Sequence, residues 1–195
     1  MNISDNEYEK YIRFYLNSQF KENTSNIKRR IRNPIRMTLM TSHIKRIANN
    51  SEYLLSTPLC ASLRLTDSCN FRCIHCLYNN GTYSSKNDLS TEQVLKIADE
   101  LINAGVAFVE LTGGEAFLRP DIMEMIRKFK ENNVSVTLLT NGSLLTDDNI
   151  NEIAELFNQY TDTVQISLDA STDEIFRKIR RSDKFDKINE NIIKL

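Results

Sequence analysis

The chain has 195 residues, a net charge of −1 and 41% hydrophobic residues, which is the composition of a globular protein. It contains no Trp, five Gly and three Pro, which disfavours an all-β chain with many tight turns, and its balanced charge disfavours a globally basic nucleic-acid-binding protein. No apolar run is long enough for a spanning helix and the first ten residues are polar, so we expect no membrane segment, no signal peptide and a cytoplasmic location.

Residues 1–57 differ in character from the rest of the chain. The spacing of apolar residues predicts helices over 8–20 and 43–55. Between residues 28 and 46 there are seven Lys or Arg and no Asp or Glu, and this run is typical of a solvated helical face or of a surface for an acidic partner. Pro58 marks a change of pattern. We therefore expect a helical, basic N-terminal extension over 1–57 and a separate domain over 58–195.

From residue 58 onward, strand patterns alternate with helical ones. We expect strands over 59–65, 106–111, 134–139 and 163–168, and helices over 91–104, 121–130, 146–157 and from 172 onward. The first of these helices has the clearest ends, because Ser90 and Gln93 form a capping-box pattern and Gly105 follows its last residue. Strands separated by helices predict an α/β fold with a parallel sheet, and the apolar strands predict that both faces are covered.

Polar residues follow each predicted strand. The segments are Thr66-Asp67, Thr112-Gly113-Gly114-Glu115, Thr140-Asn141-Gly142 and Ser167-Leu168-Asp169. In parallel α/β folds the carboxyl ends of the strands meet at one edge, and that edge carries the active site. We therefore expect these four segments to converge on one surface.

Three of the four cysteines give the strongest chemical signal. They follow the first predicted strand with the spacing C-x3-C-x2-C, and they are Cys69, Cys73 and Cys76. Three thiolates on a short loop suit an iron–sulfur cluster in which one iron has no protein ligand. A structural zinc site would need a fourth ligand from Cys60, His43 or His75, and a redox pair would use only the C-x2-C part. Cys60 begins an apolar strand and is predicted to be a core residue.

Four motifs in this order resemble the radical S-adenosylmethionine (SAM) superfamily over residues 59–195: C-x3-C-x2-C, Gly-Gly-Glu, Thr-Asn-Gly and Ser-x-Asp. The resemblance implies that the three cysteines bind a [4Fe–4S] cluster whose fourth iron is chelated by the amino and carboxylate groups of SAM. It implies that the reduced cluster passes an electron to the sulfonium, that methionine leaves, and that a 5′-deoxyadenosyl radical abstracts hydrogen from a substrate. A flavodoxin- or ferredoxin-like electron donor is an implied partner.

The resemblance also assigns roles around SAM. His75 matches an aromatic position that packs near the adenine, although it can also be a solvent-facing loop residue. Gly113 and Gly114 would let the backbone approach the methionine moiety. Glu115 would accept hydrogen bonds from the α-amino group, although it can also mark the start of a helix. The residues implied to contact the ribose, the carboxylate or the substrate are Asn141, Ser167, Asp169 and Arg180.

The sequence departs from the family pattern in two ways. Ala116 stands where the family usually has proline, and the chain has about four of the usual six βα units. We therefore expect a partial, TIM-like (β/α) barrel that ends inside the helix after the fourth strand. The segment 166–180 resembles the peptide- and protein-modifying (SPASM-type) branch, whose members usually carry a further cysteine-rich domain, but no cysteine follows Cys76.

The leading hypothesis is a radical SAM enzyme, or the N-terminal portion of one, that modifies a ribosomally made peptide. The basic segment 28–46 would then meet an acidic leader peptide. An RNA-modifying member of the family is one alternative, because the same segment could bind phosphates, although it contains no aromatic residue for base stacking. A catalytically inert, truncated cluster-binding fragment is the other alternative.

Overall fold

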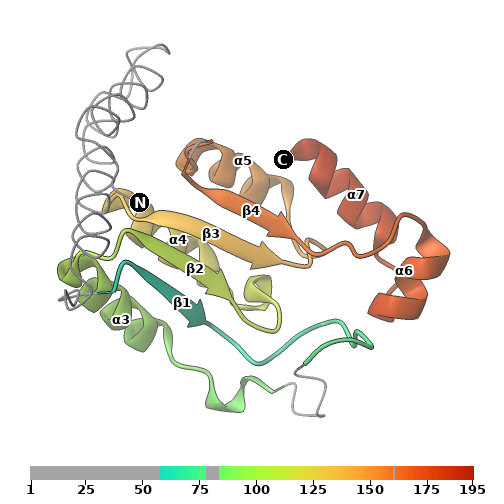
Figure 1. Ribbon diagram of the computed structural model, residues 1–195, viewed down its shortest axis with the longest axis horizontal. Helices are drawn as coiled ribbons and strands as arrows, with labels where there is room; N and C mark the ends of the chain where they lie inside the picture. Colours follow the sequence, from blue (N-terminus) through green and yellow to red (C-terminus); the bar gives the residue numbers. More distant parts are fainter. Residues whose placement is uncertain (1–57, 78–83, 160) are drawn as a thin grey trace, which may run out of the picture. The chain divides into compact units, whose positions relative to one another are not determined.

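The computed structural model describes residues 58–77, 84–159 and 161–195. Four parallel strands form one sheet in sequence order: β1 (Cys60–Arg64), β2 (Phe108–Thr112), β3 (Ser135–Thr140) and β4 (Thr163–Ile166). In Figure 1 the four arrows lie side by side and point the same way. The α/β class and the four βα units of a partial barrel are confirmed, whereas the helices expected before residue 58 lie outside the described residues.

Helices separate the strands at the predicted places. They are α3 (Thr91–Ala104), α4 (Ile122–Glu131) and α5 (Asp147–Leu156). The ends of α3 are as predicted, since Ser90 and Gln93 form a capping box and Gly105 closes the helix in the left-handed region at φ 84°. Thr146 caps α5 in the same way, with Asn149 as its partner. Local side-chain chemistry thus fixes where α3 and α5 begin.

The hydrophobic core lies between one face of the sheet and the helices. Leu111 of β2 and Leu138 of β3 are fully buried neighbours in the sheet register, and Phe129 of α4 is fully buried in the same core. Figure 1 shows α4 behind β2 and β3. This packing fixes the strands whose carboxyl ends carry the polar segments.

The expectation that both faces of the strands are covered is wrong for β1 and β4. Residues alternate between exposed and half-buried along both strands, so one face of each is not covered by the described residues. Cys60 lies on this face and is exposed, so the prediction that it is a core residue is also wrong. The face is partly polar, and Ser62 donates a 2.7 Å hydrogen bond to Glu110 across it.

The end of the chain also differs from the prediction of one helix from residue 172 onward. Two helices follow β4, namely α6 (Asp173–Arg180) and α7 (Phe185–Lys194), which Figure 1 shows beyond the sheet. Arg181 ends α6 in the left-handed region at φ 52°. Neither Gly nor Pro marks this break in the sequence. In the described part of the chain, no helix is long and apolar enough to span a bilayer.

Candidate functional site

The Gly-Gly turn after β2 lies against the loop that leaves β1. A Cβ atom on Gly114 would lie 2.2 Å from the carbonyl oxygen of Ser68, and one on Gly113 would lie 2.7 Å from that of Thr66. The backbone amides of Gly114 and Glu115 donate to these same two carbonyls, each at 2.8 Å. Neither glycine has a positive φ, so the turn needs them for space. The turn therefore holds the loop that leads into the cysteines, and its approach to a methionine moiety stays a prediction.

Glu115 is a buried carboxylate that joins β2 to the end of β3. Its Oε1 accepts hydrogen bonds from the Phe117 amide at 3.0 Å and the Thr140 hydroxyl at 2.7 Å, and its Oε2 accepts one from the Asn141 amide at 2.7 Å. The Phe117 bond also caps the short 3-10 helix η3 (Ala116–Leu118), so the helix-start role is real. Burial raises the pKa of Glu115 above its ordinary value, although these hydrogen bonds and the charge of Arg180 act in the opposite direction.

The loop with the three cysteines packs against α6. The ring of Phe71 meets that of Phe176 edge-on, with centroids 6.0 Å apart, and the amide of Ile74 donates to the carbonyl oxygen of Ile179 at 2.9 Å. Cys73 is buried, whereas Cys69 and Cys76 are half-buried. Burial raises the pKa of the Cys69 thiol, the hydrogen bond from the Phe71 amide acts in the opposite direction, and the charges of Glu115 and the other two cysteines raise the pKa further. Glu115, Cys73 and Cys76 therefore lie close enough to Cys69 for their charges to affect its ionisation.

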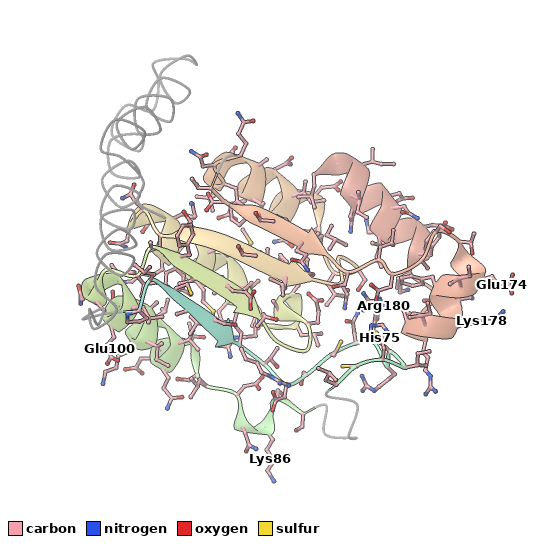
Figure 2. All side chains as sticks on the ribbon, viewed as in Figure 1. His75, Lys86, Glu100, Glu174, Lys178 and Arg180 are labelled. Carbon is pink, nitrogen blue, oxygen red and sulfur yellow. The ribbon has the colours of Figure 1, made fainter. Side chains whose placement is uncertain are left out.

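Arg180, the last residue of α6, connects the cysteine loop to the end of β4. Its Nη1 donates to Cys73 Sγ at 3.3 Å, and its Nη2 donates to the carbonyl oxygen of Ser167 and lies 2.7 Å from Asp169 Oδ2. The same carboxylate oxygen lies 3.2 Å from His75 Nε2. Figure 2 shows the Arg180 and His75 side chains close together. Four of the predicted site residues therefore gather around Cys73.

Asn141 joins the Thr-Asn-Gly segment to the cysteine loop. Its Nδ2 donates to Asn70 Oδ1 at 2.8 Å, and Asn70 Nδ2 donates in turn to the Ser143 hydroxyl at 2.9 Å. Sequence reasoning missed Asn70, Thr140 and Phe176. Thr140 and Asn70 lie inside the quoted motifs, whereas nothing in the sequence points to Phe176.

The donor set is suited to an iron–sulfur cluster. Among residues 58–77, 84–159 and 161–195, no three His, Cys, Asp or Glu side chains converge where a single metal ion could sit. A tetrahedral zinc ion needs such convergence, whereas a [4Fe–4S] cluster takes each thiolate at a different iron. In the described chain Arg180, whose Nη1 donates to Cys73 Sγ, has its Nε buried without a hydrogen-bond partner. The residues present therefore fit a cluster with an anionic ligand nearby.

Sequence comparisons agree with this chemistry. The model of the Radical SAM superfamily matches residues 63–195. Mycofactocin maturase MftC of Mycobacterium tuberculosis is 37% identical over 147 residues, which are 75% of this chain and 37% of that relative. GTP 3',8-cyclase of Rhizobium etli is 38% identical over 133 residues, which are 66% of this chain and 37% of that relative. The chain thus spans a little over a third of the length of these relatives.

Solved structures show the same fold. Streptococcus suis SuiB bound to S-adenosylmethionine matches with a TM-score of 0.60 at 17% identity, over 94% of this chain and 40% of that one. The enzyme anSMEcpe with bound AdoMet matches with a TM-score of 0.58 at 19% identity, over 70% of this chain and 40% of that one. At such identities the likeness establishes the fold alone. Because the family model covers most of the sequence in one stretch, this chain belongs to the radical SAM superfamily.

Proposed function

We propose that this chain is the part of a radical SAM enzyme that binds both cofactors and initiates the reaction. The cofactors of the family are a [4Fe–4S] cluster and SAM. One observation carries the proposal: the three-cysteine loop, buried Glu115 and the Arg180–Asp169 pair occupy the same edge of a parallel sheet. That edge is where α/β folds place their active sites.

The three cysteines would hold the cluster through their thiolates. When bound, the cluster supplies one electron to the sulfonium of SAM, which releases methionine and the radical that abstracts hydrogen from a substrate. The electron would come from a flavodoxin- or ferredoxin-like donor. The thiolates need a reducing compartment, so we also propose a cytoplasmic location.

Glu115 is suited to a cationic ligand. Its carboxylate is removed from water, so an ammonium group beside it would offset the penalty of burying the ionised form. The α-amino group of SAM is such a cation. Arg180 has one donor, Nε, without a partner in the described chain, and this donor suits the carboxylate of SAM. The other residues that we propose to contact SAM or the substrate are His75, Gly113, Gly114, Asn141, Ser167 and Asp169.

We propose a ribosomally made peptide as the substrate. A mycofactocin maturase is 37% identical over three quarters of this chain, and SuiB, which shares the fold, has also been solved with its precursor peptide SuiA. The similarity to GTP 3',8-cyclase favours a nucleotide as the competing substrate class. We also propose that residues 58–195 form the cofactor-binding core and that residues 1–57 are a separate basic extension.

The test is anaerobic reconstitution of the full 195-residue chain with iron and sulfide, followed by dithionite and SAM. We expect 5′-deoxyadenosine and methionine in equal amounts by mass spectrometry. Cys73→Ala should abolish both products, whereas Cys60→Ala, which changes the exposed cysteine of β1, should leave them unchanged. A wild-type chain that holds a complete cluster and yields no 5′-deoxyadenosine would contradict the proposal.

The same assay separates the substrate classes. Peptides encoded beside the gene and GTP are added in parallel, and the products are examined by mass spectrometry. Liquid chromatography precedes the mass measurement, because an intramolecular cyclisation of GTP can leave its mass unchanged, and we expect a changed peptide peak and an unchanged GTP peak. A changed nucleotide with unmodified peptides would replace the peptide proposal by the nucleotide one.

A further inference from the structure

We propose that Arg180 is a positioning residue that acts on the cluster through its ligand Cys73 and raises the reduction potential of the cluster. We propose further that Asp169 limits this effect. The inference rests on the proposed function in one respect, namely that Cys73 is a cluster ligand.

The geometry around Arg180 is the basis of the inference. The residue is 7% exposed, and its Nη1 lies 3.3 Å from Cys73 Sγ. Its Nη2 is held by the Ser167 carbonyl and by Asp169, which fixes the direction of the planar guanidinium. The loop that carries Cys73 is itself tied to α6 by the Ile74–Ile179 backbone hydrogen bond. The guanidinium of Arg180 and the sulfur of Cys73 are therefore each held in place, the first by Ser167 and Asp169 and the second by the backbone hydrogen bond between its loop and α6.

A guanidinium in this position favours the reduced cluster. Hydrogen bonds to cluster sulfurs are one of the features that set the reduction potential of iron–sulfur proteins. The added electron increases the negative charge on the sulfur, so a charged donor interacts more strongly with the reduced form. Burial weakens the screening by water that would otherwise reduce this effect.

Asp169 acts on Arg180 at Nη2, whereas Cys73 accepts its hydrogen bond from Nη1. Its carboxylate lies 2.7 Å from Nη2 and compensates part of the guanidinium charge, and it also faces His75 at 3.2 Å. Asp169 adopts the left-handed conformation at φ 58°, which Asn tolerates well. Asp169→Asn therefore removes the charge without changing the demand on the backbone. Removing the charge of Asp169 and removing the charge of Arg180 should thus shift the reduction potential of the cluster in opposite directions.

The experiment is a redox titration of the reconstituted full chain, with the reduced cluster followed by electron paramagnetic resonance. We expect Arg180→Met to lower the equilibrium constant for one-electron reduction about tenfold, which is about 59 mV in midpoint potential. Asp169→Asn should raise the midpoint. Lys178→Met is the matched control, because Lys178 lies on the same helix, pairs with Glu174 and is largely exposed; Figure 2 shows both side chains directed away from Arg180. Its midpoint should equal that of the wild type.

Several outcomes would overturn the inference. Unchanged midpoints in both variants would do so, and so would shifts of the same sign, because a merely loosened site would affect both variants alike. If Arg180→Met fails to retain the cluster, Asp169→Asn decides the question alone, and an unchanged or lowered midpoint refutes the inference. A wild-type chain that assembles no cluster would contradict the proposed function and this inference together, whereas a normal cluster with unshifted midpoints contradicts only this inference.

Discussion

Replacing Gly114 with Ala tests whether the turn after β2 holds the loop that leads into the cysteines. The added Cβ would lie 2.2 Å from the Ser68 carbonyl oxygen and 2.9 Å from that of Asp67, both of which are backbone atoms that cannot rotate away. The two backbones must therefore separate. That movement would break the hydrogen bonds from Gly114 to Thr66 and from Glu115 to Ser68.

The expected loss of stability follows from these contacts. Overpacking a closely packed site costs about 1–3 kcal/mol, and each of the two backbone hydrogen bonds contributes about 0.5–1.5 kcal/mol. We therefore expect the free energy of unfolding to fall by about 2–6 kcal/mol. Because the loop leads directly to Cys69, the iron content after reconstitution should fall as well.

Urea denaturation followed by circular dichroism measures the stability, and a colorimetric assay measures the iron. Gly105→Ala is the control, because Gly105 needs its left-handed φ of 84° and a Cβ there would meet nothing within 4 Å. Its cost should be about 1–2 kcal/mol, with normal iron content. A Gly114→Ala chain as stable as the wild type, with full iron content, would refute the reasoning.

Three further substitutions test other contacts. Asp121 accepts two hydrogen bonds from Arg119; burial alone would raise its pKa, but the bonds from Arg119 and Thr91 lower it below its ordinary value. The stability that ionised Asp121 contributes is therefore fully present at a pH above the ordinary pKa of an aspartate. It is lost as the pH falls through the lowered pKa that Asp121 has in the folded chain. Asp121→Asn should lower the free energy of unfolding by about 1–3 kcal/mol at neutral pH, and it should reduce the loss of stability between neutral and acid pH. A variant that loses stability in acid as steeply as the wild type would contradict this. Glu115→Gln should weaken SAM binding at least about tenfold in equilibrium dialysis, through loss of a charge-assisted hydrogen bond, and unchanged affinity would exclude the ammonium contact. Phe176→Ala should lower the free energy of unfolding by about 3–5 kcal/mol, since the ring is fully buried against the cysteine loop, and an unchanged urea midpoint would contradict that packing.

The sequence predicted the elements best where local interactions define them. Ser90, Gln93 and Gly105 lie within one helix and its caps, and both ends of α3 follow from their chemistry. The ends of β2 were less accurate, because the expected strand 106–111 is the observed Phe108–Thr112. Which residues pair in a sheet depends on the neighbouring strand, which no local pattern records.

Contacts between distant segments account for what the sequence did not reveal. Cys60 is exposed because alternate residues of β1 face away from the helices, although its neighbours in the sequence are apolar. The same limit applies to the site, where Arg180 and Cys73 are 107 residues apart in the chain. The motifs identified the chemistry of each side chain, but only the fold brings these two together. The fold likewise explains why Gly113 and Gly114 are glycines, because a side chain at either position would collide with the loop that precedes Cys69.

The central claim is that Cys69, Cys73 and Cys76 together hold a [4Fe–4S] cluster that leaves one iron for SAM. The most direct measurement is electron paramagnetic resonance of the reduced, reconstituted full chain, with and without SAM. We predict a cluster signal that SAM shifts in the wild type and in Cys60→Ala, and that is lost when any of the three cysteines is changed to Ala. A signal that SAM leaves unaltered, or one that survives the loss of Cys73, would contradict the account.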